Sequence, residues 1–363
     1  MIDIKNNKRS LIISAVLLLV LPLVLQAMGN FWVRIADFAL LYVLLALGLN
    51  IVVGFAGLLD LGFVAFFAIG AYMYGLMASP HLSDTFAGFA QMFPQGLHTP
   101  IWLVIPLSAV LAGILGVLLG APTLKLRGDY LAIVTLGFGE IIRVFLNNLD
   151  HPVNITNGPK GIGQIDSISV LGINLGKPLD LGFATLSSVT LYYYLFLVLV
   201  VVSVIICSRL ERSRIGRAWM AIREDEIAAK AMGINTVNMK LLAFGMGATF
   251  GGVSGSMFAA FQGFVSPESF SLMESVMIVA MVVLGGIGHL PGVILGAVLL
   301  SALPEVLRWV SGLLDLQAAT GGRLDASILR QLLIALAMII VMLMRPRGLW
   351  PSPEHGKSLQ KTA

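Results

Sequence analysis

The stretch 209–240, RLERSRIGRAWMAIREDEIAAKAMGINTVNMK, most constrains what this chain can fold into. It carries seven positive charges, and an uncharged run lies on each side of it, at 181–208 and at 241–267. Because about 20 apolar residues cross the hydrocarbon of a bilayer, runs of this length predict membrane-spanning helices. The excess of Lys and Arg predicts that the loop between them is cytoplasmic.

The composition agrees with a polytopic membrane protein. The 363 residues are 58% hydrophobic and only 12% charged, whereas soluble domains carry about 25% charged residues. We therefore expect an all-α transmembrane bundle forming one domain, 1–363. The net charge of +4 does not indicate a nucleic-acid partner, because most basic residues lie on one side of the predicted membrane. The single cysteine, Cys207, excludes an internal disulfide and fits a small buried apolar residue.

Hydropathy predicts ten spans, and the distribution of positive charges supports that number. The uncharged run 10–33 follows Lys5, Lys8 and Arg9 and is longer than a secretory signal, so we expect a retained first span. Ten crossings place both termini, including the tail 345–363, on the cytoplasmic side. That side then holds 16 of the 23 Lys and Arg residues, the outer side holds six, and Arg143 lies within a span. The predicted spans are about 11–29, 35–53, 61–79, 101–120, 130–148, 190–208, 241–262, 270–287, 291–310 and 328–344.

Two glycine-rich stretches interrupt the apolar pattern. Irregular backbone at membrane depth needs cover from protein or from a water-filled cavity, and discontinuous helices point to a translocation site. Tight helical hairpins packed through small residues explain the same pattern. The region 270–310 is compatible with one broken helix, but two crossings keep the C-terminal arginines cytoplasmic. The candidate break residues are Gly54, Gly57 and Gly62 in the first stretch and Gly285, Gly286, Gly288 and Pro291 in the second.

The loop 209–240 contains the signals of a short helix. Acidic residues at its start interact favourably with the helix dipole. Lys230 stands four residues after Glu226, the spacing of an ion pair along a helix, and Gly233 suits a left-handed C-terminal cap. One face is apolar, and so short a helix is marginal alone. It either rests on lipid headgroups or docks onto a cytoplasmic partner. The acidic start is Glu224, Asp225 and Glu226, and the apolar face is Ile227, Ala228, Ala231 and Met232.

Ionisable residues within predicted spans are functional candidates, because each is costly in hydrocarbon. Glu140 and Arg143 are three apart and can neutralise each other, or act in gating or at a subunit interface. Asp60 lies in the first glycine stretch and Glu274 near the start of the eighth span, positions that suit a wet or interfacial boundary. The long segments 79–100 and 149–182, predicted on the outer side of the membrane, are either simple connections or a binding surface for a soluble partner.

Catalytic constellations are missing from the sequence. The five histidines show no metal-ligand spacing, and no nucleophile and base are paired. The stretch Gly356-Lys357-Ser358 resembles the end of a phosphate-binding loop, but Pro351 stands where that loop needs glycine. We therefore expect neither an enzyme nor a metal or cofactor site on this chain.

Several stretches resemble the permease subunits of bacterial ATP-binding-cassette importers of the high-affinity branched-chain amino acid family. They are LRGDYLAIVTLGFGEIIR (126–143), SRIGRAWMAIREDEIAAKAMGIN (213–235), MIVAMVVLGGIGHLPGVILGAV (277–298), RPRGLWPS (345–352) and GFAGLLDLGFVAFFAIGAY (54–72). In that family the cytoplasmic helix docks in a groove of the ATPase. Its Glu-Ala-Ala…Gly core is similar to Glu226, Ala228, Ala229 and Gly233, preceded here by Arg223, Glu224 and Asp225.

The match departs from the family at three places. Ile227 separates the glutamate from the alanine pair, and the usual downstream Ile-x-Leu-Pro is absent. Asp60 and Phe63 also stand where a small polar residue and a histidine are commoner.

The resemblance implies a complex in the bacterial inner membrane. Its expected partners are a second homologous permease subunit, two cytoplasmic ATPases that hold ATP and Mg²⁺, and a periplasmic protein that delivers leucine, isoleucine or valine. Urea or short amides are alternative substrates within the family. A secondary carrier that acts alone is the alternative outside it.

Overall fold

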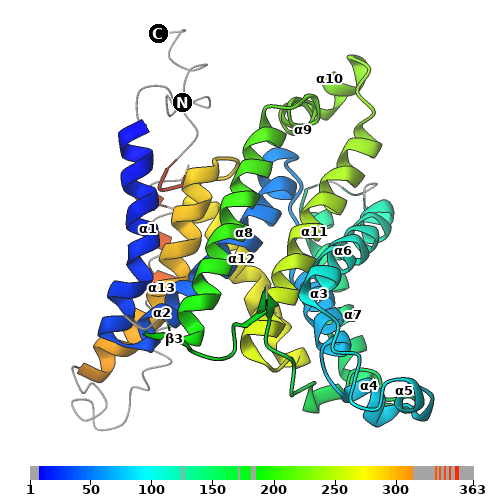
Figure 1. Cartoon of the computed structure of the whole chain (residues 1–363). Coiled ribbons are helices and arrows are strands. Elements are labelled where there is room, and N and C mark those ends of the chain that lie inside the picture. Colours follow the sequence, from blue (N-terminus) through cyan, green and yellow to red (C-terminus); the bar gives the residue numbers. More distant parts are fainter. Residues whose placement is uncertain are drawn as a thin grey trace.

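The computed structural model describes residues 8–123, 126, 128–170, 172–180 and 185–313, isolated positions between 332 and 344, and 348–350. The predicted span 328–344 and the tail 345–363 lie largely outside the described residues. Within the described part the fold is predominantly helical (Figure 1).

The first half of the chain forms five long helices with short elements between them. Gly29, at φ 131°, separates the first two helices, and the second helix continues into a π-helical segment, η1. Residues 56–63 are not helical. The elements are α1 (Lys8–Met28), α2 (Asn30–Leu49), η1 (Asn50–Phe55), α3 (Val64–Met77), α4 (His81–Thr85), α5 (Ala87–Met92), α6 (Ile101–Thr123), α7 (Asp129–Asn148) and η2 (Gly158–Lys160).

The second half adds two antiparallel β-hairpins and the remaining helices. The hairpins belong to the segment 149–187, so an all-α description holds only for the helical bundle. The elements are β1 (Ser169–Val170), β2 (Ile173–Asn174), β3 (Leu179–Asp180), β4 (Thr185–Leu186), α8 (Ser188–Glu211), α9 (Arg214–Glu224), α10 (Glu226–Ala231), α11 (Thr236–Gln262), η3 (Pro267–Phe270), α12 (Leu272–Gly285) and α13 (Leu290–Leu313).

Four described helical stretches are long and apolar enough to cross a membrane: Asn30–Phe55, Ile101–Thr123, Ser188–Glu211 and Thr236–Gln262. Four shorter apolar stretches accompany them, at Ala15–Met28, Val64–Met77, Leu272–Gly285 and Leu290–Val306. Large apolar side chains point outward from α1, α6 and α8. A helical membrane protein with several apolar helices is therefore confirmed.

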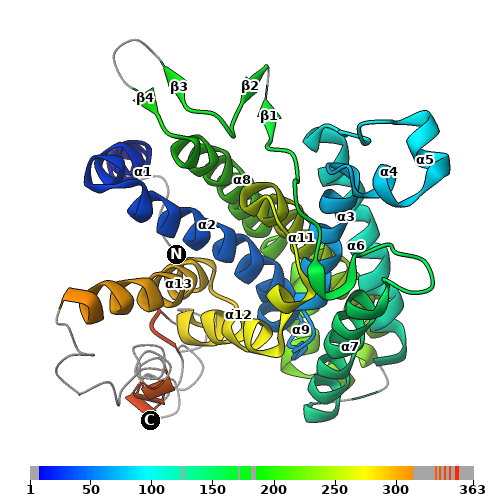
Figure 2. The ribbon, with the colours of Figure 1, turned by 90° about the horizontal axis from the view of Figure 1, so that it is seen from below.

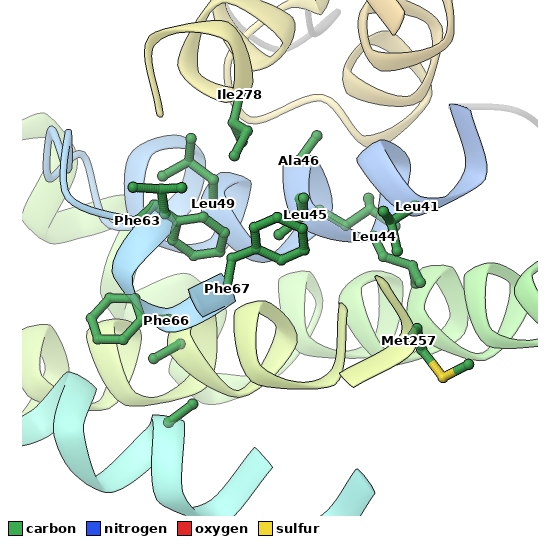
Figure 3. Packing of buried hydrophobic residues seen from close by; sticks show 14 of the residues in the cluster. Leu41, Leu44, Leu45, Ala46, Leu49, Phe63, Phe66, Phe67, Met257 and Ile278 are labelled. Atoms are coloured by element: carbon green, nitrogen blue, oxygen red, sulfur yellow. The ribbon is translucent and has the colours of Figure 1, made fainter. Parts of the chain in front are cut away.

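The core forms where α11 packs along α3, α6 and α2. A methyl group on Gly255 would lie 2.0 Å from the Phe67 oxygen, and one on Gly252 would lie 2.6 Å from the Ser108 oxygen. Small residues therefore let these backbones touch, as expected for helices that associate without a hydrophobic driving force. Figure 3 shows Leu45, Leu49 and Phe67 filling the space between α2, α3 and α11.

The two ends of the bundle differ in what they carry. In Figure 1, α9, α10 and the beginning of α1 lie at the upper end, whereas α4, α5 and β3 lie at the lower end. The lower segments are anchored by buried apolar residues such as Ile162, Ile165 and Ile168. The described parts of the segments 79–100 and 149–182 therefore pack against the bundle through buried side chains.

Candidate functional site

The loop 209–240 folds into two helices, not the single one predicted. Asp225 leaves the helical conformation at φ −154°, and its carboxylate accepts hydrogen bonds from the N–H groups of Ile227 and Ala228. It is therefore the N-cap of α10. Glu224 is the last residue of α9 and not part of the first turn of α10, so that expectation was wrong for Glu224. Gly233 follows α10 at φ 85°, as a left-handed cap requires.

The apolar face of α10 is open. Ile227 is 70% exposed and Met232 84% exposed, and Ala228 and Ala231 are exposed beside them. Ala229, on the opposite face, is buried. One side of the short helix therefore packs against the protein, and the other side is an exposed apolar surface.

Two contacts attach α9 and α10 to the beginning of α11. The Glu226 carboxylate lies 2.6 Å from Nζ of Lys240, a side chain that is only 7% exposed. The fully buried indole of Trp219 donates a 2.7 Å hydrogen bond to the Met239 oxygen. Glu226 thus pairs with a lysine on another helix rather than with Lys230, the partner that helical spacing predicted. The reason is that α10 packs against α11, which brings the buried ammonium group within reach.

Arg223, at the end of α9, reaches the first glycine stretch. Its Nη1 atom donates a 2.5 Å hydrogen bond to the backbone oxygen of Gly54. A methyl group on Gly57 would lie 2.7 Å from the Arg223 Cγ atom, and one on Gly288 would lie 2.7 Å from Nη1. Both glycines have positive φ, 70° and 81°. Only glycine allows this backbone conformation and this close approach together.

The two glycine stretches meet at that arginine. The Gly288 N–H donates a 2.9 Å hydrogen bond to Oδ1 of Asn50 in the π-helical segment. Residues 286–289 form the turn between α12 and α13, and Gly285 packs against the backbone of Gly292 on the other side of that turn. We call the group formed by Asn50, Gly54, Gly57, Arg223 and Gly288 the arginine junction.

The segment 348–350 docks onto the same turn. Leu349 N–H donates to the Leu284 oxygen over 2.8 Å, and Trp350 N–H donates to the Gly285 oxygen over 3.2 Å. His289 Nδ1 lies 2.9 Å from the Trp350 oxygen. The turn that contains Gly286, Gly288 and His289 and precedes Pro291 is therefore held on two sides, by the arginine junction and by this segment.

The first glycine stretch continues as non-helical chain. Asp60 is 1% exposed, and its Oδ1 accepts a 2.8 Å hydrogen bond from the Gly62 N–H, whereas Oδ2 has no partner among the described residues. Leu61 N–H donates to Thr135 Oγ1 of α7 over 3.0 Å, and the Leu61 oxygen accepts from Ser275 Oγ of α12 over 2.5 Å. Side chains of two helices thus satisfy the backbone that the break leaves open.

The other ionisable candidates lie on α7 and α12. Arg143 lies 2.9 Å from Glu140, so the two residues form the pair that their spacing predicted, and 3.8 Å from Glu268 of η3. Glu274 accepts a hydrogen bond from the Tyr42 hydroxyl of α2. The structure does not bring these residues into the arginine junction. Among the described residues no group of three or more His, Cys, Asp or Glu could hold a metal ion.

Sequence reasoning missed several residues that the contacts reveal. Trp219, Lys240, Asn50, Thr135 and Ser275 gave no local signal, because each acts through a partner far away in the chain. Asp37 did give one, since it is a charge inside the predicted span 35–53. It is fully buried on α2, and neither carboxylate oxygen has a partner among the described residues.

A bundle of apolar helices with broken backbone inside it, and a loop helix tied to that break, is an arrangement typical of membrane transport proteins. Comparison with known proteins agrees. The chain belongs to the family of branched-chain amino acid transport system permease components, whose match covers residues 31–343.

Individual relatives support the family over most of the chain. It is 40% identical over 331 residues to the high-affinity branched-chain amino acid transport system permease protein LivM of Salmonella typhimurium, covering 88% of this chain and 70% of the relative. LivM of Escherichia coli K12 gives the same values. The permease protein LivH of Salmonella typhimurium is 24% identical over 326 residues, covering 87% of this chain and 93% of the relative. No solved structure matches the chain.

Proposed function

We propose that this chain is a permease subunit of an ATP-driven importer that takes up branched-chain amino acids across a bacterial inner membrane. The similarity to LivM, 40% over 88% of the chain, carries this proposal. Similarity to both LivM and LivH supports pairing with a second, homologous permease subunit. Two cytoplasmic ATPases, which would hold the ATP and Mg²⁺, and a periplasmic amino-acid-binding protein complete the proposed complex.

The open face of α10 supports docking onto an ATPase. Ile227 and Met232 are large apolar side chains on a charged loop, and nothing in the described part of the chain covers them. The Glu226–Lys240 ion pair fixes α10 to α11 and the Trp219 hydrogen bond fixes α9 to it, so a force applied to α10 reaches a long helix of the core. The proposed coupling residues are Arg223, Glu224, Asp225, Glu226, Ala228, Ala229 and Gly233.

The arginine junction gives that force a second route. Movement of α9 would act through Arg223 on the Gly54 and Gly288 backbones together. Turns with positive-φ glycines absorb dihedral change at low cost, so they suit hinges. In the proposed mechanism, closure of the ATPases upon ATP binding shifts the permease pair between inward-facing and outward-facing states.

The placement of elements supports an orientation for the chain. The beginning of α1 lies at the end of the bundle that carries α9 and α10 (Figure 1). With the basic loop cytoplasmic, this end faces the ATPases and both termini are cytoplasmic. The opposite end, with α4, α5 and the two hairpins, then faces the binding protein.

The test is uptake of radiolabelled leucine by the purified complex in proteoliposomes, with and without enclosed ATP. Uptake is expected only with ATP, the ATPases and the binding protein together. Ile227→Asp and Met232→Asp are expected to abolish co-purification of the ATPases. Ile173→Asp, at a 43% exposed position on the outer hairpin, is the matched control and should leave co-purification unchanged.

Two outcomes would contradict the proposal. Uptake driven by an ion gradient without ATP would identify a secondary carrier. Transport of urea or acetamide with no competition from leucine would place the chain in a different branch of the family.

A further inference from the structure

The segment 57–61 is non-helical backbone deep in the bundle. The chain lies beside Gly288, in the turn after α12, at Gly54 and reaches Ser275, near the start of that helix, at Leu61. The ten steps from Ser275 to Gly285 rise about 15 Å in an α-helix. Residues 54–61 therefore run about half the thickness of a bilayer core alongside α12, with Thr135 of α7 on their other side.

This segment is only partly covered by its own chain. Gly57 is exposed, and Leu59 and Leu61 are half-buried. Non-helical backbone at membrane depth is tolerated where protein or water covers it, but not where lipid does. The surface formed by residues 57–61 and the flanking sides of α7 and α12, which we call the α7–α12 face, therefore does not face lipid.

Charges on the same side of α7 lead to the same conclusion. Arg143 lies between Glu140 and Glu268, and the side chain of Glu268 is 67% exposed. Charged groups within membrane segments face a protein interior or a water-filled cavity. Since α7 and η3 contact each other, this cluster continues the α7–α12 face toward the outer end of α7.

The stretches 102–118 of α6 and 198–206 of α8 differ from the α7–α12 face because they have neither charged residues nor non-helical backbone. The exposed residues of α8 between 198 and 206 and of α6 between 102 and 118 are mainly large and apolar, and neither stretch contains a charge. In Figure 2, α8 and α1 lie on one side of the bundle, whereas α7 and α12 lie together on another. The outward sides of α1, α6 and α8 are thus suited to lipid.

We propose that the second permease subunit packs on the α7–α12 face. This inference rests on the proposed function, which requires such a subunit. A homologous chain of the same fold is the fitting occupant, because it would place its own half-covered counterpart of the segment 57–61 at the same level of the membrane. Packing the two segments against each other across a pseudo-two-fold axis would cover both at once.

Photo-crosslinking from single cysteines tests the proposal in the assembled importer. Cys207, the only cysteine of the sequence, is buried and is replaced by alanine to give the background. Leu59→Cys and Leu61→Cys carry a benzophenone maleimide on the α7–α12 face. Leu136→Cys on α7, half-buried and four residues before Glu140 on the same side of the helix, is a variant that leaves the segment intact. Val110→Cys on α6 and Val201→Cys on α8, 57% and 49% exposed at these positions, are the controls.

Mass spectrometry of the adducts identifies the neighbour. We expect an adduct with the second permease chain at 59, 61 and 136, and phospholipid adducts at 110 and 201. Phospholipid at 59 or 61, a second permease chain at 110 or 201, an adduct with another copy of this chain, or no protein adduct would overturn the proposal. ATP-dependent leucine uptake, measured on the same preparations, reports separately on the proposed function.

Discussion

The guanidinium of Arg223 donates a 2.5 Å hydrogen bond to the backbone oxygen of Gly54, 169 residues earlier in the chain. The donor belongs to the charged loop, and the acceptor ends the longest apolar stretch of the N-terminal half. Gly288, from the last quarter of the chain, lies against the same Nη1 atom. One side chain thus connects the proposed docking element with both glycine-rich turns.

Removing this connection should separate ATP hydrolysis from transport. Arg223→Gln and Arg223→Lys lose the geometry of a charge-assisted hydrogen bond, worth about 1.5–3 kcal/mol. We expect leucine uptake per ATP hydrolysed to fall sharply, while the ATPases still co-purify because the face of α10 is unchanged. Arg217→Gln is the control, since the exposed Arg217 side chain donates a 3.0 Å hydrogen bond to the nearby Arg212 oxygen within the same loop. An unchanged ratio of uptake to hydrolysis in Arg223→Gln would contradict the expectation.

Adding a methyl group at Gly288 should impair the same junction. Gly288→Ala introduces a Cβ atom 2.7 Å from Arg223 Nη1 and 3.1 Å from the Gly54 oxygen, at φ 81°. Gly172→Ala is the matched control, because Gly172 has φ 86° and no atom within 4 Å of an added Cβ. Both variants carry the cost of a left-handed residue, about 1–2 kcal/mol. The midpoint temperature of thermal unfolding should fall in both variants, but only Gly288→Ala should lose leucine uptake. Equal uptake by the two variants would show that the contact with Arg223 is unimportant.

The Glu226–Lys240 ion pair should give a measurable interaction free energy. Lys240 is nearly buried, while Glu226 keeps access to water, so we expect an interaction free energy of about 1–3 kcal/mol from a double-mutant cycle of Lys240→Met and Glu226→Gln. Hydrogen exchange at the amides of α10 should speed up in each single variant. The exposed Lys230→Met is the control, expected to change stability by no more than about 0.5 kcal/mol. Additive effects in the cycle would rule out the pair as the anchor of α10.

The stability of the segment 79–100 should depend on pH through the protonation of His98. This residue lies outside the membrane-spanning helices, and its hydrogen bond to Asp166, 2.5 Å long, raises the pKa of His98 above the ordinary 6.5. Because the folded-state pKa is raised, the stabilisation is fully present below pH 6.5 and is lost as the pH rises through the folded-state value.

Limited proteolysis of the segment 79–100 across pH 5 to 9 should therefore show faster cleavage at the alkaline end. His98→Asn should remove this pH dependence, and Asn suits the positive φ of 42° at this position. His81→Asn is the control, because His81 contacts only a backbone oxygen, that of Ile155. A pH profile that survives in His98→Asn would contradict the assignment.

The helical membrane class and the family followed from sequence, because both depend on patterns that are local in the chain. Uncharged runs on each side of 209–240 require spanning helices whatever their neighbours are. The left-handed cap at Gly233 lies next to the helix that it ends, and the Glu140–Arg143 pair is set by helical spacing.

Only the tertiary structure decided which distant groups meet. Glu226 pairs with Lys240 rather than Lys230, and Arg223 binds Gly54 and Gly288, because helix packing sets these distances and sequence separation does not. The same packing decided that Thr135 and Ser275 satisfy the open backbone at Leu61. A buried polar group must find a partner wherever the fold places one, and that place cannot be found from local sequence alone.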